Sequence, residues 1–144
     1  MRPLAEIEAG LDTLASRLQA RDAARALLEA AEEVLEHWVS ARGETPTAER
    51  REGFRLLALH HQGTRGAPSF NACRETCREI AYHYNLIMLE PQAQSSSRHL
   101  HMMVMLVRHL ALFVGGKLQV ERLGEFCCSS RPLRLESPST RVRE

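Results

Sequence analysis

The sequence predicts an all-α protein, an antiparallel helical bundle of four to five helices with a flexible C-terminal tail. Apolar residues recur at alternating steps of three and four through most of the chain, which is the spacing of amphipathic helices. Clusters of glycine, proline and serine separate these segments. No segment between turn signals alternates apolar and polar residues as a half-buried strand does.

The length and charge of the chain limit its class. With 144 residues, one domain is expected, long enough to bury a core without disulfides. We expect the bundle to span residues 1–128 and a disordered tail to span 129–144, where serines and prolines replace the periodic pattern. The 19 basic and 18 acidic residues nearly cancel, so no overall field favours nucleic acid or an anionic membrane.

The first two helices are expected at about 4–20 and 23–41. One apolar stripe consists of Leu4, Ile7, Leu11, Leu14 and Leu18. A second stripe consists of Leu28, Ala31, Leu35 and Trp38, shifted by one position relative to the first. The shift falls near Arg21 and Asp22, and an aspartate is a good N-cap. Two helices are therefore favoured over one long rod.

The third helix is expected to begin at a capping signal. Gly43 ends the preceding helix, and Thr45 followed by Pro46 resembles an N-cap with proline at the first helical position. The helix should run to about His61, because two glycines and a proline in QGTRGAPS, residues 62–69, predict a loop.

The fourth helix should begin at Ser69 or Asn71 and end before Pro91. Its apolar stripe consists of Phe70, Cys73, Cys77, Ile80, Tyr84 and Ile87. Cys73 and Cys77 lie about 40° apart on this stripe. Since free cysteine is among the most often buried residue types, the favoured interpretation of the pair is a core seam.

The fifth helix is expected at 98–114, with Gly115 and Gly116 ending it and a short final helix at 117–128. Its apolar run of about fifteen residues is shorter than the roughly twenty that span a membrane. The run nevertheless has more apolar surface than one core-facing stripe can bury. We therefore expect either a fully central helix or a homodimer through residues 98–114.

A metal site is the competing interpretation of the cysteine pair. Bundle cores build such sites from facing helices, so Cys73 and Cys77 would need histidines from elsewhere, with His61 and His101 as the candidates. The other available histidines are His60, His99 and His109. Thiolate and imidazole ligands suit copper or zinc. Iron would favour carboxylates, and the Glu-x-x-His spacing of di-iron bundles is absent from the sequence.

The expected function is binding rather than catalysis. The sequence contains no phosphate-binding glycine loop, nucleophile elbow or HExxH motif. Its four cysteines do not resemble a disulfide framework, and its N-terminus does not resemble a signal peptide, so a cytoplasmic location is expected. We expect an adaptor or regulatory module that binds a protein partner or itself, without a cofactor. The alternative is a bundle that handles metal or senses metal or redox state and would bind copper, zinc or iron.

Overall fold

The computed structural model describes residues 1–121, which contain five α-helices and one 3₁₀ helix. In chain order they are α1 (Leu4–Arg17), α2 (Ala20–Ala41), α3 (Arg55–Thr64), η1 (Pro68–Cys73), α4 (Arg74–Leu89) and α5 (Ser95–Val120). This part of the chain contains no strand, only an isolated bridge between Arg51 and Phe54. The all-α prediction is confirmed.

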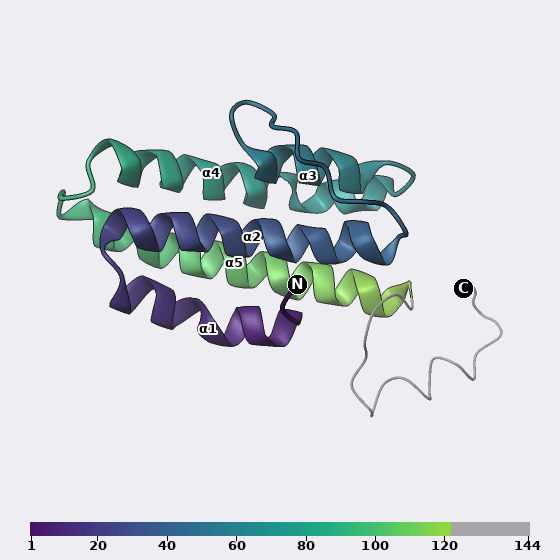
Figure 1. Ribbon diagram of the computed structural model, residues 1–144, viewed down its shortest axis with the longest axis horizontal. Helices are drawn as coiled ribbons and strands as arrows, with labels where there is room; N and C mark the ends of the chain where they lie inside the picture. The colour runs from purple at the N-terminus through teal and green to yellow at the C-terminus, as the bar shows by residue number, and fades with distance from the viewer. Residues whose placement is uncertain (122–144) are drawn as a thin grey trace.

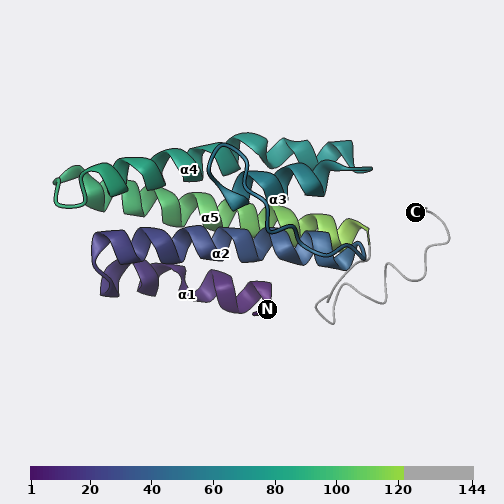
Figure 2. The same cartoon turned by 45° about the horizontal axis from the view of Figure 1, so that its top comes forward.

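The helices are arranged in three layers, as Figures 1 and 2 show. α2 and α5 lie side by side in the middle layer, α1 covers one side, and α3 and α4 cover the other. α1 runs antiparallel to α2, and α4 runs antiparallel to α5. α2 contacts all four other α-helices, so its apolar side chains form the centre of the bundle.

The core joins side chains from every layer. Its largest fully buried members are Trp38, Phe70, Ile7, Leu11, Leu27, Leu35, Leu56, Leu59, Ile80, Ile87, Met103 and Leu110. Trp38 of α2 stacks on Phe70 of η1, and Phe70 also contacts Phe113 of α5 with ring centroids 5.6 Å apart. The aromatic cluster therefore ties the short η1 helix to both helices of the middle layer.

The separation of α1 from α2 is confirmed, but it lies earlier than the sequence predicted. Leu18 and Gln19 have extended backbone conformations and interrupt the helix there. Asp22 lies in the first turn of α2 and makes no capping hydrogen bond. Its charge is nevertheless well placed, because an acidic side chain in the first turn interacts favourably with the helix dipole.

The third helix begins at Arg55, and the predicted start at Pro46 is wrong. The side chain of Gln62 accepts a hydrogen bond from the backbone N–H of Thr47 and donates one to the carbonyl of Thr45, both at 2.9 Å. Arg55 donates from Nε to the carbonyl of Thr47 at 2.8 Å. These side chains satisfy the backbone groups that a helix would otherwise pair. They hold the segment against α3 without helical structure.

Gly43 follows the end of α2 as predicted, but the glycines of α3 and α5 do not end those helices. α3 continues through Gly63 to Thr64, and α5 continues through Gly115 and Gly116 to Val120. A glycine inside a helix costs about 1 kcal/mol relative to alanine, which tertiary packing can offset. Val114 and Leu118 on either side of the glycine pair are buried. Of the predicted helix at 117–128, residues 117–120 belong to α5, and 122–128 and the tail at 129–144 lie outside the described residues.

α5 has 26 residues and extends beyond the predicted helix at 98–114 at both ends. By length and composition alone, α5 is long and apolar enough to cross a membrane. In the structure its apolar face packs against α1, α2 and α4 instead. A core helix can satisfy the same criterion, so the length of α5 is only a weak indication of a membrane span.

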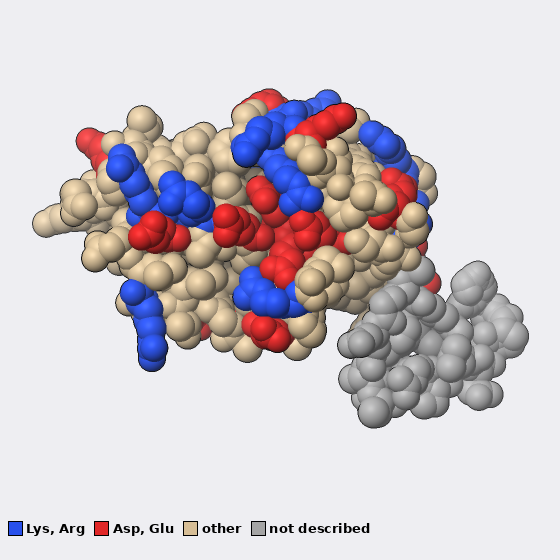
Figure 3. Space-filling view, viewed as in Figure 1, with Lys and Arg blue, Asp and Glu red and all other residues tan. Residues whose placement is uncertain are grey.

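Positive and negative side chains are interspersed on the face that carries α2, as Figure 3 shows. Arg55 of α3 pairs with Glu36 and lies 3.7 Å from Glu32, both on α2. Partial burial raises the pKa of Glu32, although Arg55 opposes the shift. At the N-terminus Arg2 pairs with Glu33. These pairs join α3 and the N-terminal segment to α2 and leave this face without one dominant sign of charge.

Candidate functional site

Cys73 and Cys77 lie in the core, as the seam interpretation predicted. Cys73 is 2% exposed and Cys77 is fully buried. They belong to the same apolar stripe as Phe70, Ile80 and Ile87, which are also fully buried. The two thiols are unpaired and lie one helical turn apart on the inner face of the chain.

Cys73 lies at the junction of η1 and α4, where it occupies the N-cap position of α4. It is the last residue of η1 and immediately precedes the first residue of α4, with a non-helical backbone conformation. Its Sγ donates to the carbonyl of Phe70 at 3.3 Å. A thiol at a helix N-terminus lies at the positive end of the helix dipole, which stabilises its thiolate form.

The histidine beside this pair is His60, not His61. His60 comes from α3, is 7% exposed, and its ring lies 6.0 Å from the ring of Phe70, measured between centroids. Its Nε2 is buried and has no hydrogen-bond partner among the described residues. Such an atom costs stability unless a nearby group supplies a partner. His61, one residue further on, is exposed.

The two thiols have pKa values displaced in opposite directions. The neighbouring Cys77 thiol and then the imidazole of His60 lower the pKa of Cys73, and they outweigh its burial. The pKa of Cys77 is raised because it lies beside Cys73 and is buried. Cys73 is therefore the more acidic thiol of the pair, and in this structure it donates as a thiol to the Phe70 carbonyl.

A small basic cavity of about 140 Å³ lies outside His60. Its lining residues are Arg51, Glu52, Leu57, His60, His61, Thr64, Asn71, Arg74 and Arg78. Arg78 pairs with Glu52 at 3.1 Å, and Arg74 pairs with its neighbour Glu75 at 2.7 Å. Asn71 and Arg74 place the junction of η1 and α4 at this cavity, although neither Cys73 nor Cys77 lines it.

The four predicted metal ligands are not brought together. His61 lines the basic cavity, and His101 faces solvent from α5. Within residues 1–121, no group of three or more His, Cys, Asp or Glu side chains is placed to hold a metal ion. Sequence spacing could not choose between His60 and His61, because the choice depends on which face of α3 meets α4.

A pair of histidines, His83 on α4 and His99 on α5, connects these two helices. The Nδ1 atoms of His83 and His99 lie 2.8 Å apart, and the ring centroids are 5.0 Å apart. The contact brings together residues of α4 and α5 that are sixteen positions apart in the sequence. Burial lowers the pKa of His83, and His99 lowers it further, while Glu79 opposes the shift.

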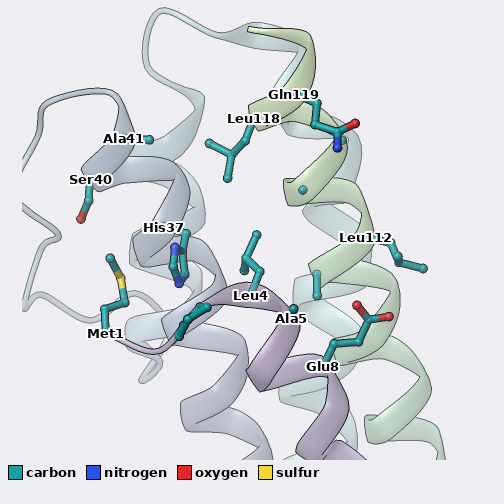
Figure 4. Close-up of a pocket in the computed structure, with 14 residues that line it drawn as sticks. Met1, Leu4, Ala5, Glu8, His37, Ser40, Ala41, Leu112, Leu118 and Gln119 are labelled. Carbon is teal, nitrogen blue, oxygen red and sulfur yellow. The ribbon is translucent and has the colours of Figure 1, made fainter. Parts of the chain in front are cut away.

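The outer face of α5 carries a third candidate surface. We call its exposed residues His101, Met105, His109 and Leu112 the outer stripe. Met105 is 50% exposed and Leu112 is 60% exposed, so α5 is not fully central. The stripe leads into a groove of about 910 Å³ between the start of α1 and the ends of α2 and α5 (Figure 4). Leu4 and Leu118 point into this groove, and Leu112 lies at its rim.

No protein-family model matches this chain, and neither the curated proteins nor the solved structures include a significant match. The function must therefore be inferred from three features: the thiol pair with its basic cavity, the His83–His99 pair and the outer stripe of α5.

Proposed function

We propose that the protein is a small cytoplasmic binding module, an adaptor or regulatory protein, that associates through α5. The observation that carries the proposal is the pair of exposed apolar side chains, Met105 and Leu112, two helical turns apart on one face. Single exposed apolar residues are common on monomers, but two in register beside a large groove favour an interaction surface.

We propose a second copy of the chain as the partner. The outer stripe contains no Asp, Glu, Lys or Arg, so two copies can meet face to face without bringing like charges together. Methionine adapts its shape readily and is enriched at interfaces. The stripe from His101 to Leu112 is about 16 Å long. Alone it is narrower than a standard interface of about 800 Å² per partner, so the adjoining groove contributes to the contact.

The groove suits this role because small residues surround it. Ala5 of α1, Ala41 of α2 and Ala111, Gly115 and Gly116 of α5 all line it. Small side chains let a neighbouring helix approach closely. Gly115 and Gly116, which do not end α5, therefore leave room in the groove that a larger side chain would fill.

Light scattering after size-exclusion chromatography tests the proposal. Wild-type protein is expected to be a dimer at micromolar concentration, and Met105→Glu and Leu112→Glu are expected to be folded monomers. Leu89→Glu is the matched control, because Leu89 is 76% exposed at the end of α4, outside the stripe. A wild-type monomer, or a dimer unaffected by both stripe variants, would contradict self-association through α5.

Metal analysis separates this proposal from the metal-handling alternative. Protein purified without an affinity tag or chelators is expected to contain no stoichiometric copper, zinc or iron. One equivalent of metal per chain would show that partner binding is not the whole function. The measurement is informative because structural and regulatory metal sites are linked to folding and survive gentle purification.

A further inference from the structure

We propose that Cys73 is a peroxide-reactive thiol and that Cys77 resolves its oxidised form into a disulfide, making the η1–α4 junction a redox switch. The proposal concerns α3, η1 and α4 and does not depend on association through α5. Its substrate is a small hydroperoxide, either hydrogen peroxide or a short alkyl hydroperoxide.

The geometry around Phe70 supports a reactive thiol rather than an inert one. Cys73 lies at the N-terminal end of a 16-residue helix, and the buried imidazole of His60 lies beside it. Nε2 of His60 has no partner among the described residues. Transfer of the Cys73 proton to this imidazole gives the nitrogen a partner, because imidazolium N–H can then donate to the thiolate. Reactive cysteines occur in such electropositive surroundings, whereas structural buried cysteines lack them.

The basic cavity limits the size of the oxidant. With a volume of about 140 Å³, it has room for a peroxide and a few water molecules but not for a bulky disulfide such as a peptide dimer. His60 and Asn71 line it but neither thiol does, so the oxidant must pass His60 to reach Cys73, and Arg51, Arg74 and Arg78 add positive charge. This charge stabilises the hydroxide or alkoxide that forms as the peroxide bond breaks.

The reaction balances without a cofactor. The Cys73 thiolate attacks one peroxide oxygen, so an S–O bond forms, the O–O bond breaks, and the departing oxygen takes a proton from the His60 imidazolium. The sulfur of Cys77 then attacks the Cys73 sulfenic acid, an S–S bond forms, and hydroxide leaves and takes the Cys77 proton as water. Overall, two thiols lose two electrons and two protons, and the hydroperoxide is reduced to an alcohol or water plus one water.

Closing the disulfide requires movement, which makes the reaction a switch. Residues one turn apart on a helix have Cβ atoms about 5–6 Å apart, whereas a disulfide needs about 3.5–4.5 Å. Cys73 can move because it lies outside the regular part of α4. It is three residues from Phe70, which stacks on Trp38. Oxidation is therefore expected to shift η1 and disturb the Trp38–Phe70 stack.

The test measures both chemistry and movement in the full chain. A Cys127→Ala, Cys128→Ala background leaves only Cys73 and Cys77, since the chain has four cysteines. One equivalent of hydrogen peroxide is expected to remove both alkylatable thiols and give a peptide linked between them. The fluorescence of Trp38, the single tryptophan, should change in parallel and recover on reduction with dithiothreitol. Peptide mapping of the oxidised wild-type chain should show the same link.

Three variants assign the roles. In the same background, Cys77→Ala should accumulate a sulfenic acid at Cys73 that dimedone traps, and Cys73→Ala should leave Cys77 unoxidised. His60→Gln should slow the oxidation roughly tenfold at pH 7 and move the pH profile of the rate upward, because an ordinary thiol is only a few per cent ionised there. A merely structural role of His60 would leave that profile unchanged.

Several outcomes would overturn the switch. Thiols that remain fully alkylatable in denaturant after excess peroxide would exclude the reaction altogether. Oxidation of Cys73 to the sulfinic acid without a link to Cys77 would exclude the resolving role. If His60→Gln does not fold, the pH profile of thiol loss in the Cys127→Ala, Cys128→Ala protein, which keeps both Cys77 and His60, still tests whether Cys73 ionises below the range of an ordinary thiol.

Discussion

The indole ring of Trp38 and the phenyl ring of Phe70 are stacked with centroids 4.7 Å apart and an angle of 4° between their planes. Gly63 of α3 lies against both rings, and its carbonyl accepts a hydrogen bond from Trp38 Nε1 at 2.9 Å. A Cβ at position 63 would lie 2.8 Å from Phe70 Cε2 and 3.0 Å from Trp38 Cδ1. The close approach of α3 to the aromatic pair therefore requires glycine at this position.

Gly63→Ala should destabilise the protein by about 1–3 kcal/mol, since overpacking a fully buried site displaces rigid groups. Gly10→Ala is the matched control, because Gly10 is also helical and a Cβ there meets nothing within 4 Å. It should be neutral or stabilise by up to about 1 kcal/mol. Urea unfolding of both variants measures the difference. Equal effects at the two positions would argue against the close contact.

The His83–His99 pair predicts a pH-dependent stability. Because the folded state lowers the pKa of His83, the unfolded chain binds more protons as the pH falls through about 6.5. The free energy of unfolding should therefore decrease on acidification from pH 7.5 to 5.5. His83→Gln should reduce this decrease, measured as melting temperature against pH.

Asn85→Gln is the control for the histidine pair, since Asn85 is exposed on α4 near His83 and does not titrate. It should leave the pH dependence of the melting temperature close to that of the wild type. The interpretation fails if His83→Gln has the same profile as the wild type. Glu79 is the nearby group that opposes the shift, so Glu79→Gln should make the acid loss of stability steeper.

The segment before α3 depends on one buried amide. Gln62 is 8% exposed and bonds to both Thr45 and Thr47. Gln62→Ala should leave these backbone groups without partners and cost about 1–3 kcal/mol. It should also speed trypsin cleavage at Arg50 and Arg51, which follow the anchored residues. Gln92→Ala, at an exposed position in the α4–α5 turn, should change neither the stability nor the cleavage rate.

Substitutions of Cys77 measure how apolar its surroundings are. Cys77→Ala removes a small, fully buried group and should cost about 1 kcal/mol, near the centre of ordinary point-mutant effects. Cys77→Ser should cost more, because a buried hydroxyl must find a partner or remain unsatisfied. Denaturant unfolding under reducing conditions compares them. A serine variant as stable as the alanine variant would indicate a polar environment around the thiol.

The amino-acid sequence alone was enough to predict the helices and most of their buried faces. The stripes through Ile7 and Leu11, through Leu35 and Trp38, and through Cys73 and Cys77 follow helical spacing, and their central residues are buried. The one-residue shift between the first two stripes also predicted the break between α1 and α2. Such features are local, because the period of apolar residues determines which face of a helix can be removed from water.

Only the tertiary structure decided where several helices end and which histidine meets the thiols. Gly63 and Gly116 are helix-breaking by local preference, but packing across the layers keeps both inside helices. Thr45 and Pro46 resemble a helix start, yet hydrogen bonds from α3 hold that segment in another conformation. His60 rather than His61 faces the core because α3 packs against α4 with that side inward. These choices depend on contacts between residues far apart in the chain, and local sequence preferences are too weak to determine them.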